Sequence, residues 1–140
     1  MEFFSGTVSH QLDAKNRIRI PAKFRAGLGK EIYFVAGSQG CISVFSKEVL
    51  EERIAALNAI RTSDAEKMRA RRKILGSIEK VTEDDQGRTL LSAFLRGHAN
   101  VQKDVVTVGM GEYLEIWSKS AYEAYTQEMT MDDAYALVDF

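Results

Sequence analysis

Basic side chains are concentrated near the start of the chain, and their spacing suits the binding of a polyanion. Six lysines and arginines lie between Asp13 and Lys30 against one acidic residue, so this segment carries about +5 although the whole chain carries −1. Local charge, rather than the total, decides whether a polyanion such as DNA can dock. Arginine can form paired hydrogen bonds with a guanine edge, and lysine suits phosphate contacts. The residues therefore predict DNA contacts from Lys15, Arg17, Arg19 and Lys23.

Charge is also segregated in the rest of the chain. From Glu66 to Lys73 five basic residues stand against one acidic residue, whereas from Glu112 to Phe140 seven acidic residues stand against one lysine. The chain thus combines a basic N-terminal part with an acidic C-terminal part. The basic run from Lys67 to Lys73 could contact DNA, but we favour an exposed helix face with the apolar side chains of the same segment turned inward.

A thirteen-residue pattern occurs twice, 71 residues apart. It runs from Asp13 to Arg25 and again from Asp84 to Arg96. Further downstream, residues 44–47 match residues 116–119 at an offset of 72. Such a repeat indicates one small supersecondary unit that is used twice. Because units of about 45 residues bury too little surface to be stable alone, we expect the two halves to share one core.

Turn residues and alternation predict the elements that hold the basic side chains. Residues 13–16 form a turn in which Asn16, and Gly87 in the second copy, take a left-handed position; Asp13, Asn16 and Gly87 are the predicted structural turn residues. After the turn, Arg17-Ile18-Arg19-Ile20 alternates strictly, so the isoleucines should face the core and the arginines the opposite side. Pro21 can then begin a short helix.

Helix starts outside the repeated motif divide the chain into regions. Ser46 suits an N-cap position, and the pairs Ser63 with Glu66 and Ser120 with Glu123 match the capping-box pattern. We assign the first repeat to residues 5–47, inter-repeat helices to 48–75, the second repeat to 76–119, and a C-terminal helix with an acidic tail to 120–140.

The first motif resembles the signature of a known class of DNA-binding domain. Asp13-Ala14-Lys15-Asn16-Arg17-Ile18-Arg19-Ile20-Pro21, followed by Phe24-Arg25, is similar to the motif of AbrB-like (SpoVT-AbrB) swapped-hairpin domains. Two copies in one chain of this length resemble the MraZ family of bacterial regulators, and the resemblance covers nearly the whole chain. It implies an α+β fold, namely a pseudo-two-fold double-split β-barrel of two swapped-hairpin repeats with peripheral helices.

The resemblance also implies a function and an assembly. It implies a sequence-specific DNA-binding transcriptional regulator, acting as a repressor of the division and cell-wall gene cluster that includes its own promoter. The implied partners are short direct repeats in double-stranded DNA and further copies of the chain, in a homo-oligomeric ring of about eight or more subunits. In related domains the arginine after the short helix also contacts DNA, which adds Arg25 to the candidates. A contact with a neighbouring subunit becomes a third interpretation of the run from Lys67 to Lys73.

The second copy of the motif is less basic than the first. Ser92 stands in the place of the proline, Gln86 in the place of Lys15, and Leu90 in the place of Arg19. We therefore expect the second repeat to bind DNA more weakly than the first, if it binds DNA. In both copies the arginine that ends the turn could instead pair with the aspartate that begins it. Three residues stay open between DNA contact and a structural role, with the structural role favoured for the first two: Asp84, Arg88 and Arg96.

The residues give little support to enzymatic, metal-binding or membrane functions. His10 and His98 are far apart, and Cys41 has no partner at metal-ligand spacing, so no metal site is expected. No phosphate-binding glycine loop is present, and no cofactor is expected. No apolar run reaches the length of a membrane span, no secretory signal is visible, and a lone cysteine fits a reduced compartment. The prediction is a cytoplasmic, nucleoid-associated protein that is not an enzyme.

Two functions from different classes remain open. The first is the DNA-binding regulator described above. The second is a protein-interaction or antitoxin-like module of the same fold, whose acidic C-terminal segment binds a protein partner while DNA binding is secondary or lost. Copurification of a stoichiometric protein partner without DNA would favour the second.

Overall fold

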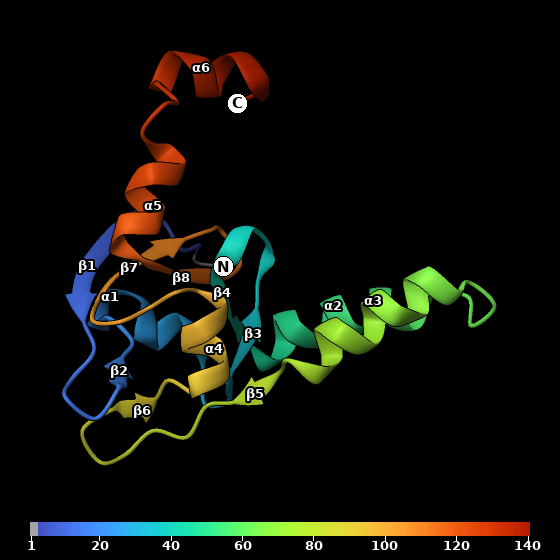
Figure 1. Cartoon of the computed structure of the whole chain (residues 1–140), viewed down its shortest axis with the longest axis horizontal. Coiled ribbons are helices and arrows are strands. Elements are labelled where there is room, and N and C mark those ends of the chain that lie inside the picture. Colours follow the sequence, from blue (N-terminus) through green and yellow to red (C-terminus); the bar gives the residue numbers. More distant parts are fainter. Residues whose placement is uncertain (1–2) are drawn as a thin grey trace.

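The duplication seen in the sequence is visible in the order of the strands. The structure, a computed structural model, describes residues 3–140 and has an α+β fold, as predicted (Figure 1). Its main sheet has six strands, every neighbouring pair of which is antiparallel. In spatial order these are β1 (Thr7–Gln11), β7 (Asp104–Gly109), β8 (Leu114–Ser118), β4 (Ile42–Ser46), β3 (Ile32–Ala36) and β5 (Glu79–Lys80).

This strand order maps onto itself when the two repeats are exchanged. The hairpin β3–β4 of the first repeat and the hairpin β7–β8 of the second meet at the centre, where Ile42 lies opposite Ile116. Each outer strand belongs to the other repeat: β1 pairs with β7, and β5 pairs with β3. The two repeats are therefore interlocked rather than side by side. Strand β1 lies at one edge of the sheet and β5 at the other.

A second, two-stranded sheet joins the repeated motifs to each other. Strand β2 (Arg17–Arg19) pairs antiparallel with β6 (Arg88–Leu90), so the two copies of the motif form one short ribbon. Each strand leaves a tight turn that needs a positive φ, which is 60° at Asn16 and 75° at Gly87. Both values confirm the predicted left-handed positions, which glycine and asparagine adopt most readily.

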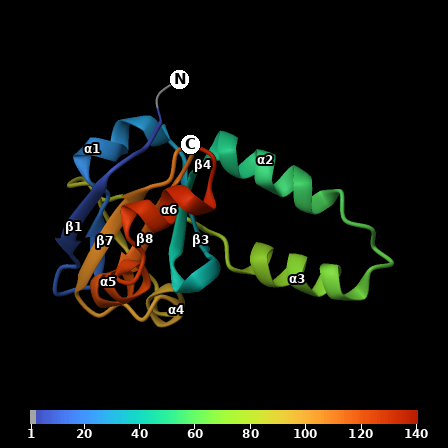
Figure 2. The ribbon, with the colours of Figure 1, turned by 90° about the horizontal axis from the view of Figure 1, so that it is seen from above.

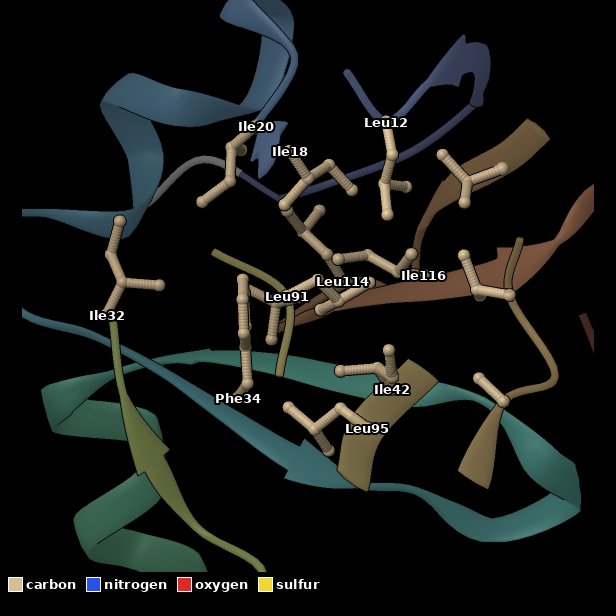
Figure 3. Packing of buried hydrophobic residues seen from close by; sticks show 14 of the residues in the cluster. Leu12, Ile18, Ile20, Ile32, Phe34, Ile42, Leu91, Leu95, Leu114 and Ile116 are labelled. Carbon is tan, nitrogen blue, oxygen red and sulfur yellow. The ribbon is translucent and has the colours of Figure 1, made fainter. Parts of the chain in front are cut away.

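The main core lies between this ribbon, the large sheet and two short helices. Ile18 and Ile20 face inward, as the alternation predicts, and Leu91 and Leu95 of the second repeat belong to the same core cluster (Figure 3). The short helices are α1 (Ala22–Arg25), which continues into the 3-10 turn η1 (Ala26–Leu28), and α4 (Ala93–His98). Equivalent residues of both repeats thus fill a single core, and neither repeat encloses one alone.

The remaining helices form two extensions from the body of the sheet. Helices α2 (Lys47–Asn58) and α3 (Ala65–Gly76) project to one side as a helical hairpin, and α5 (Lys119–Thr126) and α6 (Met131–Leu137) rise as a second arm (Figures 1 and 2). A short 3-10 turn, η2 (Ser38–Gly40), joins β3 to β4. No described helix is long and apolar enough to cross a membrane.

Two of the three predicted helix starts are wrong by one or two residues. Ser46 caps α2 as predicted, since its hydroxyl accepts from the Val49 N–H. Helix α3 is capped by Asp64 rather than Ser63, and α5 by Ser118 rather than Ser120. In each case a second residue that suits an N-cap lies within two positions, and the side chain that reaches the N3 amide becomes the cap. Aspartate and serine are both strong caps, so composition alone could not choose between them.

Adjacent leucines at the end of the ribbon test this placement of the core. Leu91→Ala should lower the free energy of unfolding by about 2–5 kcal/mol, because Leu91 is fully buried and its truncation leaves a cavity. Leu90→Ala, at a side chain that is 61% exposed, should change it by less than about 0.5 kcal/mol. Urea unfolding followed by circular dichroism measures both variants. Equal losses would contradict the register of β6.

Candidate nucleic-acid interface

The outer face of the β2–β6 ribbon carries three arginines. Ile18 and Thr89 are opposite each other and buried beneath the ribbon, at 1% and 5% exposure. Because side chains alternate along a strand, the flanking residues point outward together. Arg17 lies opposite Leu90 in this register, and Arg19 lies opposite Arg88. A two-stranded ribbon of this kind has the width that the major groove of B-DNA admits.

Each turn beneath the ribbon is closed by an aspartate that binds the arginine ending the turn. Asp13 Oδ1 accepts the backbone N–H groups of Lys15 and Arg17, each at 2.9 Å, and its Oδ2 accepts Arg17 Nε at 2.8 Å. These bonds hold the pKa of the Asp13 carboxyl below its usual value, and the bond from the Arg17 backbone N–H is the largest cause. The pairing of Arg17 with the aspartate that begins its turn, one of the two roles considered for this arginine, is therefore present.

The second turn repeats these contacts, and one longer contact links the two turns. Asp84 Oδ1 accepts the backbone N–H groups of Gln86 and Arg88 at 2.9 Å, and Oδ2 accepts Arg88 Nε at 2.8 Å. The Arg88 backbone donor is the largest cause of the lowered pKa of Asp84. Arg17 Nη1 also lies 3.7 Å from Asp84 Oδ2, across the ribbon. The contact between Asp84 and Arg88 that a structural role requires is present.

Arg25 and Arg96 are equivalent in the repeat but have different partners. The Arg25 guanidinium donates from Nε and Nη2 to Glu83, with a shortest distance of 2.6 Å, and from Nη1 to the Gly29 carbonyl. This pair connects helix α1 of the first repeat to the segment before the second turn. In the first repeat the position of Glu83 is occupied by the buried Leu12, so Arg96 has no such carboxylate and donates instead to the Leu91 carbonyl.

The other three predicted DNA-binding side chains are exposed to solvent. Lys15, Arg19 and Lys23 form no ion pair among residues 3–140, although the Lys23 ammonium lies 5.5 Å from the centre of the Phe24 ring. In the second repeat the positions of Arg19 and Lys23 are held by Leu90 and Phe94, which are 61% and 58% exposed. At these two positions the motif is therefore basic in the first copy and apolar in the second, which agrees with the less basic second copy noted in the sequence.

Two like charges face each other at the centre of the ribbon. The guanidinium groups of Arg19 and Arg88 belong to directly opposed residues, whose Cβ atoms lie about 5 Å apart in an antiparallel pair. Like charges in this position are destabilising unless something neutralises them. Arg88 is neutralised by Asp84, and Arg19 has no such partner among residues 3–140. The geometry leaves Arg19 as the arginine of the ribbon with most to gain from a bound anion.

The cysteine and the two histidines of residues 3–140 are occupied by contacts within the fold. Burial raises the pKa of the Cys41 thiol to about 12, so the thiol stays protonated. His10 contacts the Thr107 hydroxyl, and His98 contacts the Gly37 carbonyl. Among residues 3–140, no group of three or more potential ligands that could hold a metal ion is found.

Comparison with known proteins gives the family. A family model described as "MraZ protein, putative antitoxin-like" matches the chain twice, over residues 3–73 and 74–137. The chain belongs to the MraZ family. Among its relatives named transcriptional regulator MraZ, that of Natranaerobius thermophilus is 39% identical over 89% of this chain and 87% of the relative. That of Carboxydothermus hydrogenoformans is 38% identical over 98% of both chains, and that of a Thermoanaerobacter species is 36% identical over 86% and 85%.

Membership in the MraZ family confirms the resemblance stated from the motifs and the coarse prediction of a transcriptional regulator. Sequence reasoning nevertheless missed Glu83, the residue that binds Arg25. Its only signal is that a carboxylate replaces an apolar residue at the position equivalent to Leu12. Nothing in the spacing of the two residues, 58 positions apart, indicates that they meet.

The turn aspartates provide a prediction about stability. Asp13→Ala and Asp84→Ala should each lower the melting temperature at pH 7. Each change removes a carboxylate that accepts three hydrogen bonds within one turn. Asp85→Ala is the matched control, since the exposed Asp85 carboxylate has no partner among residues 3–140. Differential scanning calorimetry measures all three.

The pH dependence of that difference follows from the lowered pKa values of Asp13 and Asp84. A carboxyl whose pKa is lower in the folded state stabilises the fold above its unfolded pKa, near 3.8, and loses this effect as pH falls through the folded value. The gap between each turn variant and wild type should therefore narrow below about pH 4. A gap that stays constant down to pH 2 would contradict an ionic role for the turn.

Proposed function

We propose that this chain is a sequence-specific DNA-binding transcriptional regulator. It represses the division and cell-wall gene cluster that includes its own promoter, and it binds short direct repeats through basic faces displayed on a ring-shaped oligomer. The observation that carries the DNA-binding part is the outer face of the β2–β6 ribbon, where Arg17, Arg19 and Arg88 lie together. The target genes, the direct repeats and the ring rest on membership in the family.

The basic side chains on and near the ribbon differ in the kind of DNA contact that they could make. Arg17 and Arg88 are held in fixed positions by their turn aspartates, so their remaining N–H groups can meet a base edge with little loss of side-chain freedom. Arg19 presents an uncompensated charge between them. Lys15 in the first turn and Lys23 on α1 are exposed and suit phosphate contacts at the sides of the groove. Arg25 remains a candidate, although reaching DNA requires its release from Glu83.

One ribbon per subunit is a small interface, and repetition is the means of strengthening it. Several identical ribbons on one assembly, each opposite one direct repeat in the DNA, gain affinity from effective concentration without any new type of contact. The repeated sites would then match the repeated subunits. A chain with a net charge of −1 can bind a polyanion in this way, since only its ribbon face has to approach the duplex.

The central test removes the unpaired arginine of the ribbon. Arg19→Ala should weaken binding to a duplex from the chain's own upstream region by about tenfold or more, because a hydrogen bond between charged groups, here the guanidinium and a phosphate, contributes about 1.5–3 kcal/mol. Lys119→Ala is the control, since it removes the same charge at the start of α5, far from the ribbon (Figure 1). Fluorescence anisotropy measures the affinity and analytical ultracentrifugation verifies the oligomer. Unchanged affinity with intact oligomers would remove the proposal.

Salt dependence separates DNA binding from a protein-interaction function. Log affinity for DNA should fall linearly with log salt, and Lys15→Ala should reduce that slope by about one for each subunit engaged. A flat salt response would exclude phosphate docking. A stoichiometric protein partner, with no bound DNA, would then favour the antitoxin-like alternative in which the acidic C-terminal segment makes the interaction.

A further inference from the structure

Most of the large exposed apolar side chains of residues 3–140 lie in the C-terminal arm. Helix α5 is anchored to the sheet because the Trp117 ring packs against Tyr122 and Tyr125, with ring centres 5.7 and 5.0 Å apart. Beyond it, no residue of α6 is buried. The large apolar side chains exposed by more than half between residues 125 and 140 are Tyr125, Met129, Met131, Tyr135, Leu137, Val138 and Phe140.

A helix in this position needs a surface to cover it. Helix α6 has seven residues, and isolated helices shorter than about 12 residues are marginal in water even with good sequences. Its N-terminus is defined by a capping box, in which Thr130 and Asp133 bind each other's backbone N–H. A cap fixes where the helix starts but does not supply the burial that stabilises it. A contiguous exposed apolar segment with a defined helix start marks an interaction surface.

The opposite arm of the molecule offers a complementary surface. At the tip of the α2–α3 hairpin lies a cavity of about 300 Å³ lined by Ala56, Ala59 and Ile60, with charged residues Arg61, Asp64 and Lys67 also in its lining. Helix α3 contributes no buried residue to the fold. The two helices are linked near this end by Arg71, which donates to Asn58 at 2.7 Å. The hairpin therefore presents an apolar hollow with cationic side chains at its edge.

The charges of the two arms are opposite. Residues 123–140 contain five carboxylates and no lysine, arginine or histidine. Residues 61–73, at the tip and along α3, contain six basic residues against two acidic ones. An acidic segment with apolar side chains fits an apolar hollow with a basic edge, and this fit would also speed and orient the encounter.

We infer that the C-terminal arm of one copy docks on the tip of the α2–α3 hairpin of a second copy. Within a single chain the tip and α6 lie well apart in both views, so the match has to be made between copies (Figures 1 and 2). An interface that joins two different surfaces is heterologous and closes into a ring when the rotation between copies permits. The inference rests on the homo-oligomer of the proposed function and names the surfaces that build it.

Mixing two singly impaired chains tests this assignment. Leu137→Glu disables the arm and Ile60→Glu disables the hollow, and each should weaken self-association by about 30-fold or more, as for a central interface residue. Mixed together, they should form a complex of one chain of each type, because the first retains an intact hollow and the second an intact arm. Analytical ultracentrifugation without DNA measures the masses.

Control variants keep the result interpretable. Met110→Glu places the same change at a side chain that is 43% exposed and outside both arms, and it should leave the oligomer unchanged. Arg61→Glu, at an exposed side chain that lines the hollow, repeats the Ile60→Glu test without changing an apolar residue. Thermal unfolding of each variant by circular dichroism verifies that the body of the chain remains folded.

The outcomes separate this inference from the proposed function. Wild-type oligomers that persist in both Leu137→Glu and Ile60→Glu would overturn it, and so would folded variants that stay monomeric when mixed. Impaired chains should still bind a single short DNA site weakly through the ribbon. Loss of that single-site binding in Ile60→Glu and Arg61→Glu, with self-association intact, would overturn the inference and make the hairpin a DNA contact. Failure of Arg19→Ala to affect DNA binding would leave the mixing result untouched.

Discussion

The pairing of β2 with β6 is the contact on which the rest of the molecule depends. It is the place where the two copies of the motif meet, and it covers the core with Ile18 from one copy and Thr89 from the other. Because side chains alternate along each strand, the register that buries Ile18 and Thr89 also places the arginines together on the outer face of the ribbon. A slip of one residue would turn Arg17 and Arg19 inward, where a charged side chain without partners is strongly disfavoured. The same strand register is thus required both for folding and for the basic surface.

Duplication explains the scaffold, and divergence explains how its two halves are used. Both copies keep the aspartate that binds two backbone N–H groups and one arginine, because this contact shapes the turn. The exposed positions have changed freely: Leu90 and Phe94 replace the basic residues of the first copy. The turn contact is therefore kept in both copies, whereas these two exposed positions differ.

The sequence predicts the elements and their faces better than it predicts the contacts between distant residues. Alternation at residues 17–20, the positive φ at Asn16 and Gly87, and the cap at Ser46 are local effects, and the structure confirms all three. Local reasoning misplaced two helix starts because neighbouring residues were equally suitable caps. The interlocking of strands could be expected only from the resemblance. The ion pair between Arg25 and Glu83 could not be predicted at all, because it depends on how two remote segments meet.

The aspartate–arginine turns bear on how a ribbon of this size could discriminate between sequences. An arginine already held by a carboxylate contributes less net charge, so it attracts DNA less strongly at a distance. It also loses less side-chain freedom on binding, and its fork is aimed before the duplex arrives. Fixed donors penalise a wrong base, because a misplaced N–H group would be left without an acceptor. On the proposed DNA interface, the division between paired Arg17 and Arg88 and unpaired Arg19 would therefore separate selectivity from attraction.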